Sequence, residues 1–95
     1  MNYKFEWDEA KAHENKRKHN ISFEEAETVF EDENAVLFYD DIHSSEEERF
    51  KIIGMDSVLR QLTVVHCYRN NNEVVRIISA WKATKNERKI YEEGL

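Results

Sequence analysis

The chain has 95 residues, 40% of them hydrophobic, which is enough for one core, and we expect a single domain over residues 1–95. It has no apolar run long enough for a membrane helix or a signal peptide, and its one cysteine, Cys67, excludes an internal disulfide, so we expect a cytoplasmic protein with no membrane partner. The net charge of −6 argues against a nucleic-acid coat protein, although residues 51–95 are basic enough either for a local phosphate-binding surface or for an ordinary solvated one.

The first third of the chain predicts a strand followed by two helices. Residues 3–7 alternate apolar and polar side chains, which is the period of a strand. Asp8 can cap a helix over residues 9–18, whose few apolar side chains suggest a surface position. Ser22, followed three residues later by a glutamate, has capping-box spacing and opens a second helix over residues 23–31.

The remainder predicts four strands and a final helix. The predicted strands cover residues 35–39, 49–54, 59–69 and 73–81. Residues 40–48 should form a loop, because no apolar periodicity follows their possible caps. Thr84 begins another capping box, which predicts a helix through about Glu93. This order of elements, with short links, indicates an α+β fold with a mostly antiparallel β-sheet, two N-terminal helices and one C-terminal helix packed on it.

The two longest strands should form a hairpin through Asn71 and Asn72, because asparagine tolerates the positive φ angles of a tight hairpin turn. The predicted cross-strand pairs are Arg69 with Val74, Cys67 with Arg76, and Val65 with Ile78. A slip of one residue would instead pair Arg76 with His66, so that alternative stays open.

In the preferred register, Arg69, Arg76 and Lys82 share one face of the hairpin, while His66 and Trp81 share the other. Fixed cations can stabilise the negative charge that builds on a phosphate during cleavage, or they can simply pair with the many carboxylates of the chain. His66 can act as a general acid or base near neutral pH, or it can be a core residue in an apolar strand.

The sequence predicts no metal site and no cofactor. His13, His19 and His43 show no metal-ligand spacing with each other or with Cys67. Cys67 lies in an apolar strand without an activating neighbour, so we interpret it as a packing residue.

Four segments resemble the BrnT toxin family. They are FEWDEAK at residues 5–11, RKHNISFEEA at 17–26, HS and ERF within 43–50, and RIISAWKATKNER at 76–88. Each segment alone is weakly specific, but together they follow the order of the family over nearly the whole chain.

The resemblance implies a RelE-like fold and a type II toxin that cleaves RNA without a metal ion. It also implies a ribbon-helix-helix antitoxin of the BrnA kind, with operator DNA bound only through that antitoxin, in an assembly of two copies of each. Arg69, Arg76, Lys82 and His66 are then the candidate catalytic residues. Two other classes remain open: a partner-binding module that has lost the chemistry, and a sequence-independent nucleic-acid binder.

Two positions depart from the family pattern. Trp81 stands where the family commonly has arginine, which either removes a phosphate-stabilising charge or supplies a ring that stacks on a base. Asn20 replaces the usual glycine, a mild change because asparagine tolerates the same backbone. For the partner, we expect the acidic segments 24–33 and 40–48 to attract basic antitoxin residues. Exposed aromatic residues, with Tyr39, Trp81 and Tyr91 as candidates, should anchor the complex.

Overall fold

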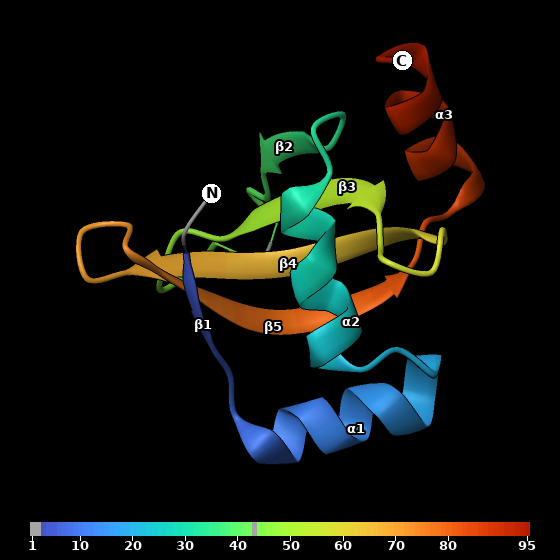
Figure 1. Ribbon diagram of the computed structural model, residues 1–95. Coiled ribbons are helices and arrows are strands. Elements are labelled where there is room, and N and C mark those ends of the chain that lie inside the picture. The colour runs from blue at the N-terminus through green and yellow to red at the C-terminus, as the bar shows by residue number, and fades with distance from the viewer. Residues whose placement is uncertain (1–2, 43) are drawn as a thin grey trace.

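The computed structural model describes residues 3–42 and 44–95, and it contains one mixed sheet with strand order β1-β5-β4-β3-β2 (Figure 1). The strands are β1 (Lys4–Glu6), β2 (Val36–Tyr39), β3 (Phe50–Met55), β4 (Gln61–Arg69) and β5 (Val74–Lys82). β1 runs parallel to β5, and the other neighbours are antiparallel. The predicted α+β class with a mostly antiparallel sheet is therefore confirmed. The motif and metal predictions that involve His43 fall outside the described residues.

The helices begin and end where the caps predict. They are α1 (Glu9–His19), α2 (Phe23–Glu27), the 3₁₀ helix η1 (Thr28–Glu31) and α3 (Lys85–Glu93). Asp8 caps α1, and Asn20 closes it in the left-handed conformation. Complete capping boxes at Ser22 and Thr84 open α2 and α3. The predicted second helix is thus correct in extent, but its last turn tightens into η1.

One face of the sheet is covered by α2 and η1, which cross in front of it (Figure 1). Phe23, Ala26 and Val29 from these helices are fully buried and pack against strand residues such as Val64 and Ile77. We call this the helix-covered face. Its aliphatic and aromatic side chains form the main core, because they leave water together on one side of the pleat.

The opposite face of the sheet is covered only at one end. There α3 packs Tyr91 against Ile53 and Ala83 in a second, smaller cluster. The hydroxyl group of Tyr91 donates to Asp32 Oδ2 at 2.7 Å. Tyr91 is therefore buried, and the prediction that it is an exposed anchor is wrong. We call the rest of this side the open face.

α1 lies along the free edge of β5, beyond the point where short β1 ends (Figure 1). The buried amide of Asn15 fixes it there by bonding to the main chain, as a neighbouring strand would. Asn15 Nδ2 donates to the carbonyl oxygens of Ala80 (2.9 Å) and Ile21 (3.0 Å), and the Ala80 N–H donates to Asn15 Oδ1 at 3.0 Å. The surface position predicted for α1 is correct, since Asn15 is its only buried residue.

The hairpin is regular near its turn and irregular in its middle. Arg69 pairs with Val74 and Cys67 with Arg76, as predicted, and the turn residues Asn71 and Asn72 both have positive φ. A bulge at Ile78 then shifts the register, so that Val65 pairs with Ser79 rather than with Ile78. An extra residue in one strand reverses the side on which each following side chain stands.

The bulge corrects two face assignments. Lys82 pairs with Leu62, whose side chain is in the core of the helix-covered face, so Lys82 does not share the face of the two hairpin arginines. Trp81 pairs with Thr63 and moves onto the open face.

None of the helices in the described part of the chain has the length and apolar character needed to cross a membrane.

Candidate RNA-cleavage site on the open face

Two arginines from adjacent strands stand on the open face. Arg76 of β5 lies directly opposite Cys67, and Arg69 follows two residues later on β4, so both guanidinium groups project to the same side. Arg76 Nη1 is 2.8 Å from Glu6 Oε2, and Arg69 Nη2 is 3.1 Å from Glu47 Oε2. Both arginine side chains keep substantial exposure, 32% and 45%. An incoming phosphate can therefore reach them.

A hydrogen bond to Glu6 holds Arg76 in position and favours its charged form. Glu6 is its neighbour across the parallel β1–β5 pair, and this bond raises the pKa of Arg76 above its already high value. Arg49 adds a third guanidinium nearby, with Nη2 3.6 Å from Glu47 Oε1. The carboxylates hold the cations in place, and arginine offers planar paired donors that match phosphate oxygens.

Lys51 and Trp81 extend this group of cations along the open face. Lys51 pairs with Val65, and its Nζ lies 5.7 Å from the centre of the Trp81 ring. Trp81 Nε1 donates to Glu87 Oε1 at 3.1 Å, which orients the ring. A partly exposed tryptophan beside a lysine provides a surface on which a base can stack while its phosphate is held.

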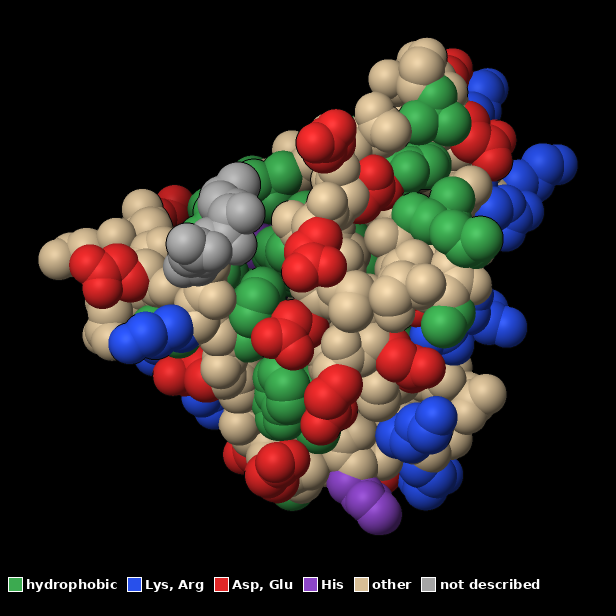
Figure 2. All heavy atoms as spheres, in the orientation of Figure 1, with side chains coloured by type: hydrophobic (Ala, Val, Ile, Leu, Met, Phe, Trp, Pro, Cys, Tyr) green, Lys and Arg blue, Asp and Glu red, His purple; other side chains and the backbone are tan. Residues whose placement is uncertain are grey.

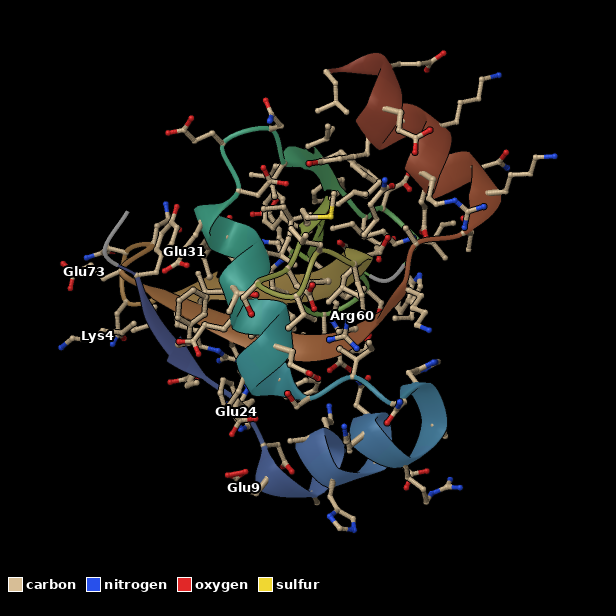
Figure 3. The ribbon with its side chains drawn as sticks, turned by 45° about the vertical axis from the view of Figure 1, so that its right-hand side comes forward. Lys4, Glu9, Glu24, Glu31, Arg60 and Glu73 are labelled. Atoms are coloured by element: carbon tan, nitrogen blue, oxygen red, sulfur yellow. The ribbon has the colours of Figure 1, made fainter. Side chains whose placement is uncertain are left out.

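The last turn of α1 adds cations at the margin of the open face. This turn holds Lys16, Arg17, Lys18 and His19. The His19 and Trp81 rings lie 6.4 Å apart, and a shallow hollow of about 180 Å³ separates Lys18 and His19 from Ser79 of β5. Arg60, in contrast, lies on the side of the molecule that carries α2 (Figure 3). There it is bound to Asp56 and Glu25 and takes no part in the site.

His66 is separated from the arginines by the sheet itself. Its ring is fully buried on the helix-covered face and contacts Phe30, Phe50 and Tyr68. Burial lowers the pKa of His66 to about 4. The structure therefore shows a neutral core histidine whose ring nitrogens lie against Val64 O and Tyr68 Oη, both at 3.2 Å.

Cys67 lies between the arginines, but it is a packing residue. It is buried, and burial raises the pKa of its thiol, with the negative charge of Glu47 adding to the shift. A thiol with a raised pKa is a poor nucleophile at neutral pH. Within residues 3–42 and 44–95, no three acidic, histidine or cysteine side chains are grouped closely enough to hold a metal ion.

Sequence reasoning found the two arginines but missed three of their neighbours on this face. Glu6 comes from the parallel edge strand, Glu47 comes from the loop before β3, and Lys51 belongs to β3, the strand next to β4 in the sheet. The alternation of polar and apolar side chains along residues 49–54 could have placed Lys51 and Ile52 on opposite faces of the sheet. No local pattern could have paired Glu6 with Arg76, which is 70 residues away.

Comparison with known proteins defines the class. The family model for "Ribonuclease toxin, BrnT, of type II toxin-antitoxin system" matches residues 7–87. The crystal structure of the Brucella abortus ribonuclease toxin BrnT is similar, with a TM-score of 0.67 and 25% identical residues. That match covers 87% of this chain and 99% of the Brucella chain. Comparison with curated proteins gives no match.

These matches define a ribonuclease toxin of a type II toxin-antitoxin system. The chain belongs to the BrnT family, and that membership implies an antitoxin as its partner.

Proposed function

We propose that this chain is a metal-independent endoribonuclease with a RelE-like fold that inhibits growth and cleaves RNA on its open face. The observation that carries the proposal is that Arg69 and Arg76 share one accessible face of the sheet. Lys51 and Trp81 lie on the same face. Phosphodiester cleavage builds negative charge on the phosphate oxygens, and guanidinium groups that are already oriented stabilise that charge. Because His66 and Lys82 belong to the other face, the proposed set excludes them.

Proton transfer needs groups beside these arginines. The attacking hydroxyl gives up a proton, and the leaving oxygen takes one up. Glu6 and Glu47 are the carboxylates that contact Arg76 and Arg69, and both are exposed enough to meet a substrate. We propose that one of these carboxylates, once RNA phosphate has displaced it from its arginine, accepts the proton of the attacking hydroxyl. The carboxylic acid so formed then donates that proton to the leaving oxygen.

The partner in this proposal is a ribbon-helix-helix antitoxin of the BrnA kind. The toxin is blocked when the antitoxin covers the route to the open face, and operator DNA is bound only through the antitoxin. We propose an assembly of two toxins and two antitoxins. Size-exclusion chromatography with light scattering on the co-expressed pair measures this stoichiometry, and separate elution of the two proteins at micromolar concentration would contradict it.

The test of catalysis is the double variant Arg69→Ala and Arg76→Ala, assayed on an RNA oligonucleotide in buffer containing EDTA. We expect wild-type cleavage to survive EDTA and the double variant to lose about 10²–10³-fold in rate. Lys82→Ala combined with Lys89→Ala removes the same charge from outside the proposed set and should leave the rate unchanged. Cleavage that persists in the folded arginine double variant would refute the assignment, and cleavage that stops in EDTA would refute metal independence.

A second candidate is a partner-binding module that keeps the fold without the chemistry. Two observations favour it: each hairpin arginine is already paired with a carboxylate, and Trp81 occupies the position of a common family arginine. In that case the folded wild-type chain binds its antitoxin but does not cleave RNA or slow growth. The cleavage and growth assays on the wild-type chain therefore distinguish the two candidates.

A further inference from the structure

The outer strand β2 exposes large side chains at the edge of the sheet. Among the described strands it pairs only with β3, and the side chains of Leu37 and Tyr39 are 50% and 47% exposed. They share the helix-covered face with Ile52 and Phe50, their partners across the strand pair. An exposed, apolar edge strand is a template for pairing with another chain.

The backbone of β2 also has unused hydrogen-bonding groups. The N–H of Asp40 donates to the carbonyl of Arg49 at 2.9 Å, which continues the β2–β3 register by one pair. Hydrogen-bonded and non-hydrogen-bonded pairs alternate along an antiparallel ladder, so Phe38 also points its N–H towards β3. The N–H and C=O groups of Leu37 and Tyr39 must then point outward, away from the sheet.

A groove runs beside this edge on the helix-covered face. About 440 Å³ of it is lined by Tyr3, Phe30, Leu37 and Tyr68, among others. A second hollow of about 600 Å³ shares Tyr3, Leu37 and Tyr68 with the first and continues to Arg69. The two hollows thus join the exposed edge of β2 to one of the arginines assigned to the proposed site.

The rim of the groove is acidic. Glu31 and Glu33 line the first hollow, Glu48 lines the second, and none of the three forms an ion pair with another described residue. Figure 2 shows acidic side chains along the ridge of α2 and η1 with hydrophobic side chains beside them. Figure 3 places Glu24 near one end of this ridge and Glu31 near the other. Positive side chains are therefore favoured in whatever fills the groove.

We propose that β2 and this groove form the antitoxin-docking surface, and that the occupant is an extended antitoxin segment that adds a strand to β2. Its apolar residues enter the groove beside Leu37 and Tyr68, and its Lys or Arg residues face Glu31, Glu33 and Glu48. Main-chain hydrogen bonds supply affinity in this mode, and alternate side chains supply specificity. The proposal rests on the proposed function, because it locates the binding site of that antitoxin.

This placement explains how binding would silence the enzyme. A segment that follows the groove towards its second hollow arrives at Arg69 and obstructs the approach of RNA phosphate. Inhibition then requires no change in the sheet.

The test is amide hydrogen exchange on the chain alone and in complex with the ribbon-helix-helix protein encoded beside it. In the free chain, the amides of Leu37 and Tyr39 should exchange quickly and that of Phe38 slowly. In the complex, the first two should slow by at least about tenfold, because each gains a hydrogen bond. Phe38 is the internal control, since its N–H is already bonded.

Two variants provide an independent measurement of affinity. Leu37→Pro removes an outward N–H without removing a β2–β3 bond, and it should weaken antitoxin binding at least about tenfold. The double variant Leu37→Ala with Tyr39→Ala keeps the backbone, removes the apolar anchors and should also weaken binding. Val58→Ala truncates a side chain that is 60% exposed elsewhere and should leave the affinity unchanged.

Each outcome distinguishes the docking surface from the proposed function. A complex that forms with unchanged Leu37 and Tyr39 exchange and full affinity in both β2 variants would overturn the docking proposal and leave the toxin function standing. Concentration-dependent protection of these amides in the isolated chain would identify a second copy as the occupant and overturn it as well. Failure of the wild-type chain to bind this antitoxin would overturn both the docking proposal and the partner assigned to the toxin.

Discussion

Replacing Asn15 with alanine should remove much of the stability of the fold through a single side chain. Asn15 makes three hydrogen bonds to the main chain of Ile21 and Ala80, and it is only 6% exposed. At about 1 kcal/mol net per bond, the loss is about 3 kcal/mol. The higher helix propensity of alanine offsets roughly 0.6 kcal/mol of this loss. The free energy of unfolding should therefore fall by about 2–3 kcal/mol.

That loss is large beside the roughly 5–15 kcal/mol that stabilises a typical domain. The melting temperature should fall by roughly 10–20 °C. Urea denaturation followed by circular dichroism measures the change directly. Asn86→Ala is the matched control, because it removes an exposed asparagine from α3 and reports the propensity gain alone. A loss below about 1 kcal/mol in Asn15→Ala, with the denaturant slope unchanged, would show that the Asn15 bonds do not fix α1 to β5.

Two further predictions concern buried positions. Burial lowers the pKa of His66 to about 4. Near pH 6.5 the His66 ring therefore takes up a proton in the unfolded chain but stays neutral in the folded chain. The stability that this neutral ring contributes is complete above pH 6.5 and is lost as pH falls towards 4, by about 3 kcal/mol. His66→Gln should flatten that part of a denaturation profile measured against pH, and an unchanged profile would contradict the assignment. Gly54→Ala would place a methyl group 3.0 Å from two neighbouring side chains and should cost about 1–3 kcal/mol in urea denaturation. Gly94→Ala, where the nearest atom is 3.5 Å away, should cost little, and equal midpoints for the two variants would refute the steric argument.

Local signals in the sequence predicted the elements well because those elements depend on neighbours in the chain. Asp8, Ser22 and Thr84 accept from backbone N–H groups three residues ahead, so their spacing alone predicts where the helices begin. Asn71 and Asn72 fix the turn in the same way, and the turn sets the register of the pairs next to it.

The candidate site depended on contacts that no local pattern reveals. The faces assigned to Lys82 and Trp81 were wrong because the bulge at Ile78 leaves the apolar run of β5 unbroken. Arg76 was placed correctly, because it lies between the turn and the bulge. Its partner Glu6 depends on a parallel strand pair formed by distant segments, and such pairing follows from the packing of the whole sheet.

The bulge at Ile78 also determines which face of the sheet each following side chain of β5 occupies, and it limits how the open face can change during evolution. Point substitutions can exchange the side chain at position 81 among tryptophan, arginine and other residues while leaving it on the open face. Deletion of residue 78 would remove the bulge and leave Ser79, Ala80 and Trp81 opposite the same residues of β4, on the faces they now occupy. If Ile78 instead paired with Val65 in a regular ladder, Trp81 would move to the helix-covered face and Ala80 to the open face. The bulge therefore keeps the residue at position 81 on the open face, whichever side chain that residue carries.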